Sequence, residues 1–173
     1  MVRSPASLDA AEEEVVAALM AMSRLFVGVA ARSLAQLADD VTLAQYRVLV
    51  LLVSRGPQRV VDLSQELSVT SSTATRMCER LVRKGLAGRY ARADDRRATW
   101  IGLTPAGRDL VGEVMRRRRE AIGELVREVS VTHPHAFASV LHAFVEAAGE
   151  VPAAQWEERW RNSVPLSQNY VHQ

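Results

Sequence analysis

The stretch from Thr70 to Gly107, TSSTATRMCERLVRKGLAGRYARADDRRATWIGLTPAG, constrains the fold of this chain more than any other. It predicts a helix over residues 71–84, a tight turn, a two-stranded ribbon and a second helix that begins at Pro105. Thr70 is a natural N-cap, and Gly85 can end the helix in the left-handed conformation. This order of elements places a helix and a ribbon, two chemically different surfaces, side by side.

The predicted helix has an apolar face and a polar face. At 100° per residue, the apolar residues have the spacing of a core-facing stripe: Ala74, Met77, Cys78 and Leu81. The opposite face carries short hydroxyls followed by arginines. Hydroxyls let a backbone approach phosphate, and arginine can bind guanine through two hydrogen bonds. Taken alone, this face is equally well interpreted as a solvated surface.

The neighbouring elements favour the nucleic-acid interpretation. Residues 86–92 and 98–103 are predicted strands, joined by turn residues at 93–95, and two arginines follow at the tip. Upstream, residues 61–67 predict a short helix, and Ser68-Val69 a connecting turn. A helix–turn–helix followed by a β-hairpin is a winged helix, with one surface for the major groove of DNA and one for the minor groove.

The charge distribution agrees with this interpretation. Residues 71–100 carry eight Arg or Lys against three Asp or Glu, whereas the whole chain has a formal net charge of only +2. The excess of positive charge therefore lies where phosphates would lie. Arginine outnumbers lysine 21 to 1, so arginine enrichment by itself is weak evidence. The evidence for nucleic-acid binding is therefore the position of the arginines along the chain, not their number.

Three segments between residues 41 and 107 resemble the MarR family of bacterial transcription regulators: VTLAQYRVLVLL, DLSQELSVTSSTATRMCERLVRKGL and DDRRATWIGLTPAG. The DRR wing followed by LTPAG is the specific part of this resemblance. The resemblance implies a homodimer that binds a palindromic double-stranded DNA operator. It further implies repression that is released by a small molecule or an oxidant.

The resemblance also implies which residues contact DNA. In the recognition helix, the residues that would read the major groove are Ser71, Ser72, Thr75, Arg76 and Arg80. In the wing, Arg96 and Arg97 would enter the minor groove, braced by Asp95, with Arg92 as a further contact. One position departs from the family pattern, because Val60 stands where a Ser or Thr cap is usual. We expect Asp62 to stabilise the start of that short helix instead.

The flanking segments predict a mainly α fold with a small β-wing. Apolar periodicity predicts long helices over residues 8–37, 105–129 and 134–149. These helices have too little core of their own, so we expect them to pack against a second copy of the chain. The expected organisation is an N-terminal dimerisation helix (1–40), the winged helix–turn–helix domain (41–104), C-terminal dimerisation helices (105–150) and a tail docking on the dimer (151–173).

The tail carries Trp156 and Trp160, which are four residues apart and share a helix face. Two exposed tryptophans are unusual in a soluble protein, so we expect them to dock onto the dimer. Lining or closing an effector pocket is a less favoured use.

Arg118 lies at the centre of the apolar stripe of the helix over residues 105–129. A buried guanidinium needs a carboxylate or several carbonyls. The favoured interpretation is an ion pair with an acid of the N-terminal helix or of a partner chain. The alternative is an anionic effector, such as an aromatic carboxylate, that binds Arg118. The neighbouring Arg116, Arg117 and Arg119 are expected to be solvated.

Other chemistries have little support in the sequence. Cys78 lies on the inward stripe without a resolving cysteine, so we expect a core residue and keep a redox sensor as an alternative. His133, His135 and His142 lack the Cys or acidic partners of a metal site. No nucleophile–base pair or phosphate loop is recognisable, so we expect neither an enzyme nor a cofactor.

The leading hypothesis is therefore a ligand-responsive, dimeric DNA-binding repressor. With no run of about 18 apolar residues and no signal peptide, we expect a cytoplasmic protein without a membrane partner. The main alternative is a winged-helix module that binds proteins instead of DNA. The wing arginines argue against that alternative.

Overall fold

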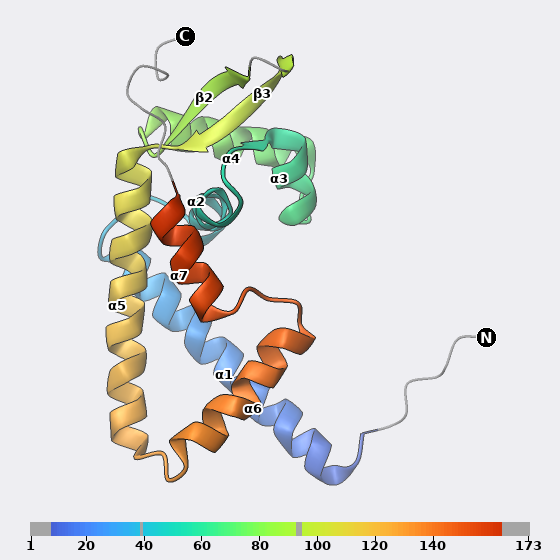
Figure 1. Cartoon of the computed structure of the whole chain (residues 1–173), viewed down its shortest axis with the longest axis vertical. Helices are drawn as coiled ribbons and strands as arrows, with labels where there is room; N and C mark the ends of the chain where they lie inside the picture. The colour runs from blue at the N-terminus through green and yellow to red at the C-terminus, as the bar shows by residue number, and fades with distance from the viewer. Residues whose placement is uncertain (1–7, 39, 93–94, 164–173) are drawn as a thin grey trace, which may run out of the picture.

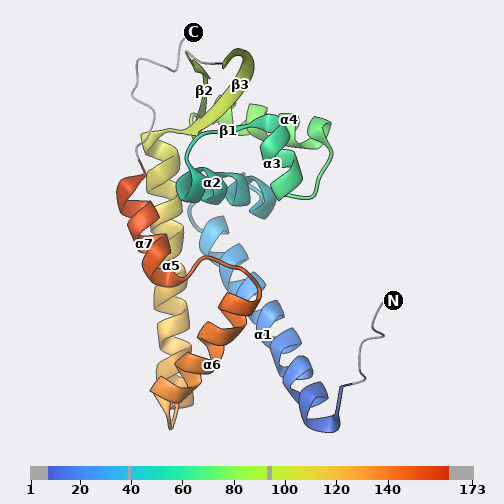
Figure 2. The same ribbon diagram turned by 45° about the vertical axis from the view of Figure 1, so that its right-hand side comes forward.

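The computed structural model describes residues 8–38, 40–92 and 95–163, without the side chains of residues 90–98, 153 and 154. A small globular unit lies at one end, and long helices extend from it (Figures 1 and 2). The elements in chain order are α1 (Ala10–Ala35), α2 (Leu43–Arg55), β1 (Gln58–Arg59), α3 (Val60–Glu66), α4 (Ser71–Arg83), β2 (Ala87–Arg92), β3 (Asp95–Leu103), α5 (Pro105–Val129), α6 (Pro134–Ala147) and α7 (Ala153–Asn162). The fold is mainly α with a small β-wing, as the sequence predicts.

Helices α1, α2, α4 and α5 each begin after a residue whose side chain caps the helix. Asp9 and Thr42 start α1 and α2 with capping boxes, and the Thr104 side chain caps α5 immediately before Pro105. The predicted cap of α4 at Thr70 is confirmed, and Gly85 has a φ of 69° directly after that helix. The helix ends predicted from the sequence differ from the observed ends by only a few residues.

The sheet differs from the predicted two-stranded ribbon. Among the described residues it has three antiparallel strands in the order β1-β3-β2, because Gln58 and Arg59 pair with Ile101 and Trp100. A two-residue strand has no periodicity that a sequence could reveal. β3 also begins at Asp95 instead of Ala98, because Arg92 pairs with Asp95 and only residues 93 and 94, which lie outside the described chain, connect the strands.

One hydrophobic core joins the winged helix to the first half of α5. Leu49 of α2, Leu63 of α3, Leu81 of α4 and Ile101 of β3 are fully buried in it, together with Val111 of α5. The start of α5 is therefore anchored to the DNA-binding unit.

The junction between the wing and α5 is held by polar contacts. The Thr104 hydroxyl donates to the carbonyl of Gly85 at 2.6 Å and accepts from the amide of Gly107 at 3.1 Å. Gly107 packs so closely that a Cβ atom there would lie 2.0 Å from the carbonyl oxygen of Leu86. Only glycine fits this contact.

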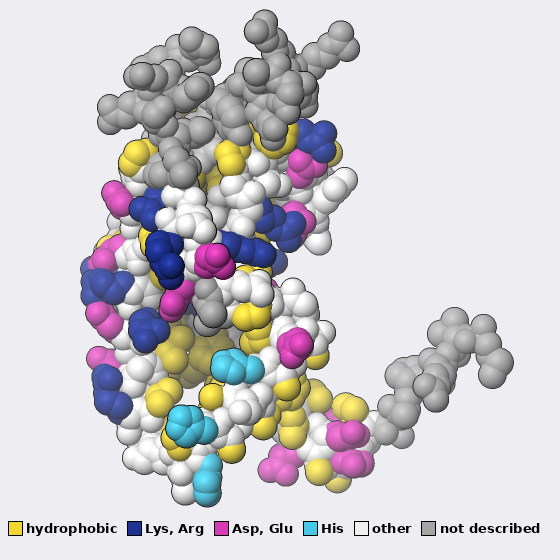
Figure 3. Space-filling model, in the orientation of Figure 1, with side chains coloured by type: hydrophobic (Ala, Val, Ile, Leu, Met, Phe, Trp, Pro, Cys, Tyr) yellow, Lys and Arg dark blue, Asp and Glu magenta, His cyan; other side chains and the backbone are white. Residues whose placement is uncertain are grey.

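The long helices leave apolar side chains exposed in the single chain. In α1, exposed residues include Val15, Val16, Met20 and Val27, and along α6, all of which the structure describes, no residue is buried. Figure 3 shows a hollow with an apolar floor between α5 and α6, and the histidines of this region lie beside it.

Among the described helices, α1 alone is long and apolar enough to cross a bilayer. Its most apolar 18-residue window has a mean hydropathy of 1.7, and 6% of that window is buried. The expectation that no run of about 18 apolar residues occurs still holds here, because charged residues interrupt α1. An averaged window tolerates such interruptions, since every 18-residue window of α1 includes Arg24 and at least one of Glu14 and Arg32. One such helix is weak evidence for a membrane span, because helices covered by protein have the same composition.

Candidate nucleic-acid interface

The recognition helix α4 presents the polar face that the sequence predicts. Its inward residues Ala74, Cys78 and Leu81 are buried in the core, with Met77 at the edge. All five predicted groove-reading residues are exposed: Ser71, Ser72, Thr75, Arg76 and Arg80. The Thr75 hydroxyl donates to the carbonyl of Ser71 at 2.8 Å, so it lies against its own helix.

Two arginines of this face have no internal partner. Within the described part of the chain, neither Arg76 nor Arg80 forms an ion pair, whereas the acid between them, Glu79, lies 3.4 Å from Arg89 of β2. Arg89 therefore offsets the negative charge that would repel phosphate from this surface. The result is an exposed, cationic face on a helix that a core holds rigidly.

Helix α3, which precedes the turn at Ser68-Val69, begins differently from the prediction. Its N-cap is Arg59, not Val60, and no side chain caps the backbone there. Asp62 lies in the first turn, as expected, but its carboxylate accepts two hydrogen bonds from the Arg59 guanidinium, both at 2.8 Å. This pairing lowers the pKa of Asp62. The turn itself is confirmed, since Ser68 has a φ of 53°, in the left-handed region.

The wing places the predicted minor-groove residues along the hairpin. Arg92 ends β2 and pairs in register with Asp95, the first residue of β3, and Arg96 and Arg97 follow it. The side chains of these four residues lie outside the described part of the structure. Their contacts with DNA, and the brace by Asp95, therefore stay predictions.

Cys78 is a core residue, as the sequence predicts. It is 1% exposed and lies on the inner wall of a cavity of about 440 Å³ between α3, α4 and the wing. Burial raises the pKa of its thiol to about 11, because a thiolate is poorly solvated there. A reactive thiol needs exposure and a lowered pKa, and Cys78 has neither.

We therefore expect the native thiol to resist a disulfide reagent such as DTNB at pH 8 and to react once the protein is denatured. The chain has one cysteine, so denatured protein should release one equivalent. The protonated thiol also favours the folded state below the unfolded pKa of about 9, and this contribution is lost as the pH rises towards 11. Rapid labelling of native protein at pH 8 would instead restore the redox-sensor alternative.

Arg118 is half-buried and lies beside the phenol of Tyr46 in α2. Burial of the phenol raises the pKa of Tyr46 to about 12, although the nearby guanidinium lowers it in part. Among the described atoms, the Nε of Arg118 and the hydroxyl of Tyr46 are buried without a hydrogen-bond partner.

The expected ion pair between Arg118 and an acid of the N-terminal helix is absent from the described chain. The physical reason is the position of the acids. All three acidic residues of α1 lie near its start, at positions 12–14, whereas the opposite end of α1 is the end that approaches α2 (Figure 1). Arg118 instead lines an open hollow along α5, with Met115, Arg119 and Ile122 among its neighbours.

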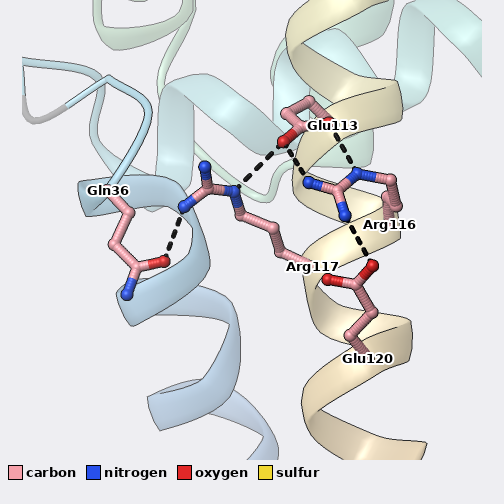
Figure 4. A network of polar contacts seen from close by, with 5 residues as sticks. All are labelled: Gln36, Glu113, Arg116, Arg117 and Glu120. Atoms are coloured by element: carbon pink, nitrogen blue, oxygen red, sulfur yellow. Dashed lines mark hydrogen bonds and ion pairs between the residues drawn. The ribbon is translucent and has the colours of Figure 1, made fainter.

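A polar network joins the end of α1 to α5, and it was not predicted from the sequence (Figure 4). Arg117 was expected to be solvated, but it donates to Gln36, the C-cap of α1, at 2.8 Å and to Glu113 at 3.2 Å. Arg116 pairs with Glu113 and Glu120. The two arginines hold the pKa of Glu113 at about 2. The i,i+3 and i,i+4 spacing of these charges was a visible signal, but the contact with Gln36 was not.

The histidines of the α6 region are exposed, and His133 precedes α6 without capping it through its side chain. Within residues 8–38, 40–92 and 95–163, no group of three or more His, Cys, Asp or Glu side chains is placed to hold a metal ion. The exposed face of α4 described above carries arginines and hydroxyls.

Comparisons with known proteins agree with this geometry. The sequence profile of the MarR family matches residues 41–99. The multiple antibiotic resistance protein MarR of Salmonella typhimurium is 37% identical over 68 residues, which are 39% of this chain and 47% of the relative. The matched segment thus spans about half the length of the curated relatives.

Solved structures extend the similarity over most of the chain. The crystal structure of RV1404 from Mycobacterium tuberculosis has a TM-score of 0.76 and 35% identity, covering 85% of this chain and 99% of that one. A Staphylococcus aureus MepR mutant bound to an oligodeoxyribonucleotide has a TM-score of 0.58 and 25% identity, covering 78% and 97%. The chain therefore belongs to the MarR family of transcriptional regulators.

Proposed function

We propose that this chain is a homodimeric, sequence-specific DNA-binding repressor of a palindromic operator, acting in the bacterial cytoplasm. Each protomer would place α4 in the major groove and the wing in the adjacent minor groove. The observation that carries the proposal is the exposed polar face of α4, on which Arg76 and Arg80 have no ion-pair partner in the described chain. The structural similarity to a MepR mutant bound to an oligodeoxyribonucleotide supports it. The family resemblance implies that the protein represses transcription and does not activate it.

The homodimer is supported by the apolar side chains on the long helices. Phe137, Val140 and Phe144 of α6 are each 44–55% exposed, and Val126 and Val129 at the end of α5 are exposed as well. Exposed apolar side chains in this number on neighbouring helices are typical of a protein interface. A second copy would cover it with the same surface, and the two-fold axis would place the two α4 helices about 34 Å apart, one turn of DNA.

We retain the organisation proposed from the sequence: dimerisation through residues 1–40 and 105–150, DNA binding through residues 41–104, and a docked tail over residues 151–173. Regulation would work by population shift. The free dimer holds its α4 helices near the operator spacing, and an effector favours a different spacing.

The effector site is proposed at Arg118 and takes a small anion, such as an aromatic carboxylate. The unpartnered Nε of Arg118 and the unpartnered hydroxyl of Tyr46 support this, because a carboxylate accepts hydrogen bonds from both groups. Salicylate is a suitable probe for calorimetric titration. We expect Arg118→Ala to weaken its binding about tenfold or more, since a charge-assisted hydrogen bond contributes about 1.5–3 kcal/mol. Equal affinities in wild type and variant would refute the assignment.

The DNA-binding proposal is tested by fluorescence anisotropy on DNA from upstream of the chain's own gene, titrated across salt concentrations. We expect tight binding, a steep salt dependence and a stoichiometry of two chains per operator. The double variant Arg96→Ala/Arg97→Ala should lose most of the affinity, because it removes both proposed minor-groove arginines. Scrambled DNA is the control. Equal, weak binding to both DNAs would favour the protein-interaction alternative.

A further inference from the structure

The helix α7 returns from the dimerisation helices to the DNA-binding unit. In Figures 1 and 2, the chain runs down α5, crosses in α6 and comes back along α7 to the region of α2. A helix of ten residues is marginal by itself, so packing must hold it in place. Trp156 and Trp160 provide that packing, since both are half-buried against the hydrophobic core. The family profile ends at residue 99 and does not include this helix.

Trp160 fits against a glycine of α5. A Cβ atom on Gly112 would lie 2.9 Å from Cζ2 and 3.0 Å from Cη2 of the Trp160 indole. Glycine in the interior of a helix destabilises it by up to about 1 kcal/mol relative to alanine. At this position, the missing side chain is what allows the indole to reach the α5 backbone.

The side chain of Arg108 in α5 binds the C-terminal end of α7. Its guanidinium carbon lies 4.8 Å from the centre of the Trp160 ring, over the indole. Its Nη2 donates to the carbonyl of Trp160 and its Nε donates to the hydroxyl of Ser163, both at 3.1 Å. A cation at the C-terminus of a helix also interacts favourably with the unpaired carbonyls there. One side chain therefore binds both the ring and the end of α7.

The other side of α7 faces the winged helix. The helix lies against α2, and a cavity of about 300 Å³ at this seam is lined by Leu52 and Pro57, by Leu103 at the base of the wing, and by Arg159 and Asn162 of α7. Contacts to α5 on one side and to α2 on the other make α7 a brace between the two.

We propose that α7 fixes the orientation of the winged helix relative to α5, with Trp160 and Arg108 as positioning residues for DNA binding. Neither residue lies on α4 or the wing, so they act through geometry alone. In a dimer, this orientation sets the distance between the two α4 helices. The consequence for operator binding rests on the proposed function, whereas the brace within one chain does not.

The test measures the orientation without DNA. Spin labels on Arg83→Cys at the end of α4 and Glu128→Cys near the end of α5, both exposed positions, report an intrachain distance by pulsed electron resonance. Dilution with unlabelled protein suppresses signals between chains, and the buried Cys78 is not expected to label. We expect a narrow distance distribution in the otherwise wild-type chain and in Trp160→Phe, which keeps an aromatic ring. Trp160→Ala should broaden or shift the distribution. Equal distributions in all three would overturn the proposal.

Two further variants guard against trivial outcomes. Glu157→Ala removes an exposed side chain of α7 and should leave the distribution narrow. If Trp160→Ala fails to fold by circular dichroism, Arg108→Gln keeps the indole and removes the guanidinium, and it should broaden the distribution. A narrow distribution in Arg108→Gln would then overturn the proposal.

Operator binding provides the functional readout. We expect Trp160→Ala to bind the operator about tenfold more weakly, because fewer molecules hold the competent orientation, and to tolerate changed half-site spacing better. If the wild type binds no operator while the distance still depends on Trp160, the proposed function fails and the brace stands. If the wild type binds tightly and Trp160→Ala matches it in both distance and spacing preference, only the brace fails.

Discussion

Replacing Gly107 with alanine is expected to destabilise the folded protein by about 3 kcal/mol or more, or to prevent folding. The added Cβ would lie 2.0 Å from the carbonyl oxygen of Leu86 and 2.9 Å from its carbonyl carbon. Both are backbone atoms in the segment that leads into the wing, so no side chain can move aside. Relief of the clash requires α5 to move away from the wing, and this would also disturb the hydrogen bond from Gly107 to Thr104.

The measurement is urea unfolding followed by circular dichroism. Ala106→Gly is the matched control, because it makes the reverse exchange at the exposed neighbouring position and should change stability by no more than about 1 kcal/mol. A midpoint for Gly107→Ala within the range of the control would show that the junction can relax. The close contact between α5 and Leu86 would then not be a constraint on the fold.

Arg76→Ala is expected to weaken operator binding about a hundredfold or more. A bidentate contact between arginine and guanine contributes about 1–3 kcal/mol, and a dimer would lose it at both half-sites. Arg76 is exposed on α4 and has no ion-pair partner in the described chain, so its removal leaves no unpaired charge inside the protein. Stability should therefore be nearly unchanged, which separates lost binding from lost folding.

The binding measurement uses anisotropy on the operator and on operators with single base changes. Arg47→Ala is the control, since it removes the same charge from an exposed position on α2. If Arg76 reads a base, its variant should discriminate less at one operator position. If it contacts phosphate, affinity should fall uniformly and the salt dependence should become shallower. An unchanged affinity on every DNA would remove Arg76 from the interface.

Local signals in the sequence predicted much of the fold. Thr70 and Thr104 mark helix starts because each side chain accepts a hydrogen bond from the backbone amide three residues later. Pro105 marks a start because a first helical residue needs no N–H donor, and Gly85 marks a helix end. The faces of α4 follow from periodicity alone, so the burial of Cys78 and the exposure of Arg76 were predictable. These features depend on residues within about one helical turn of each other, and that is why the sequence determined them.

The tertiary structure decided the features that join distant parts of the chain. β1 pairs with β3 across more than 40 residues, Gln36 meets Arg117, and Trp160 meets Gly112. Tyr46 of α2 likewise approaches Arg118 of α5. The acidic residues of α1 lie at its start, too far from Arg118 to pair with it. No periodicity or local propensity encodes such pairs, because each depends on how the helices cross. The sequence determined which surfaces each element presents, and packing decided which surfaces meet.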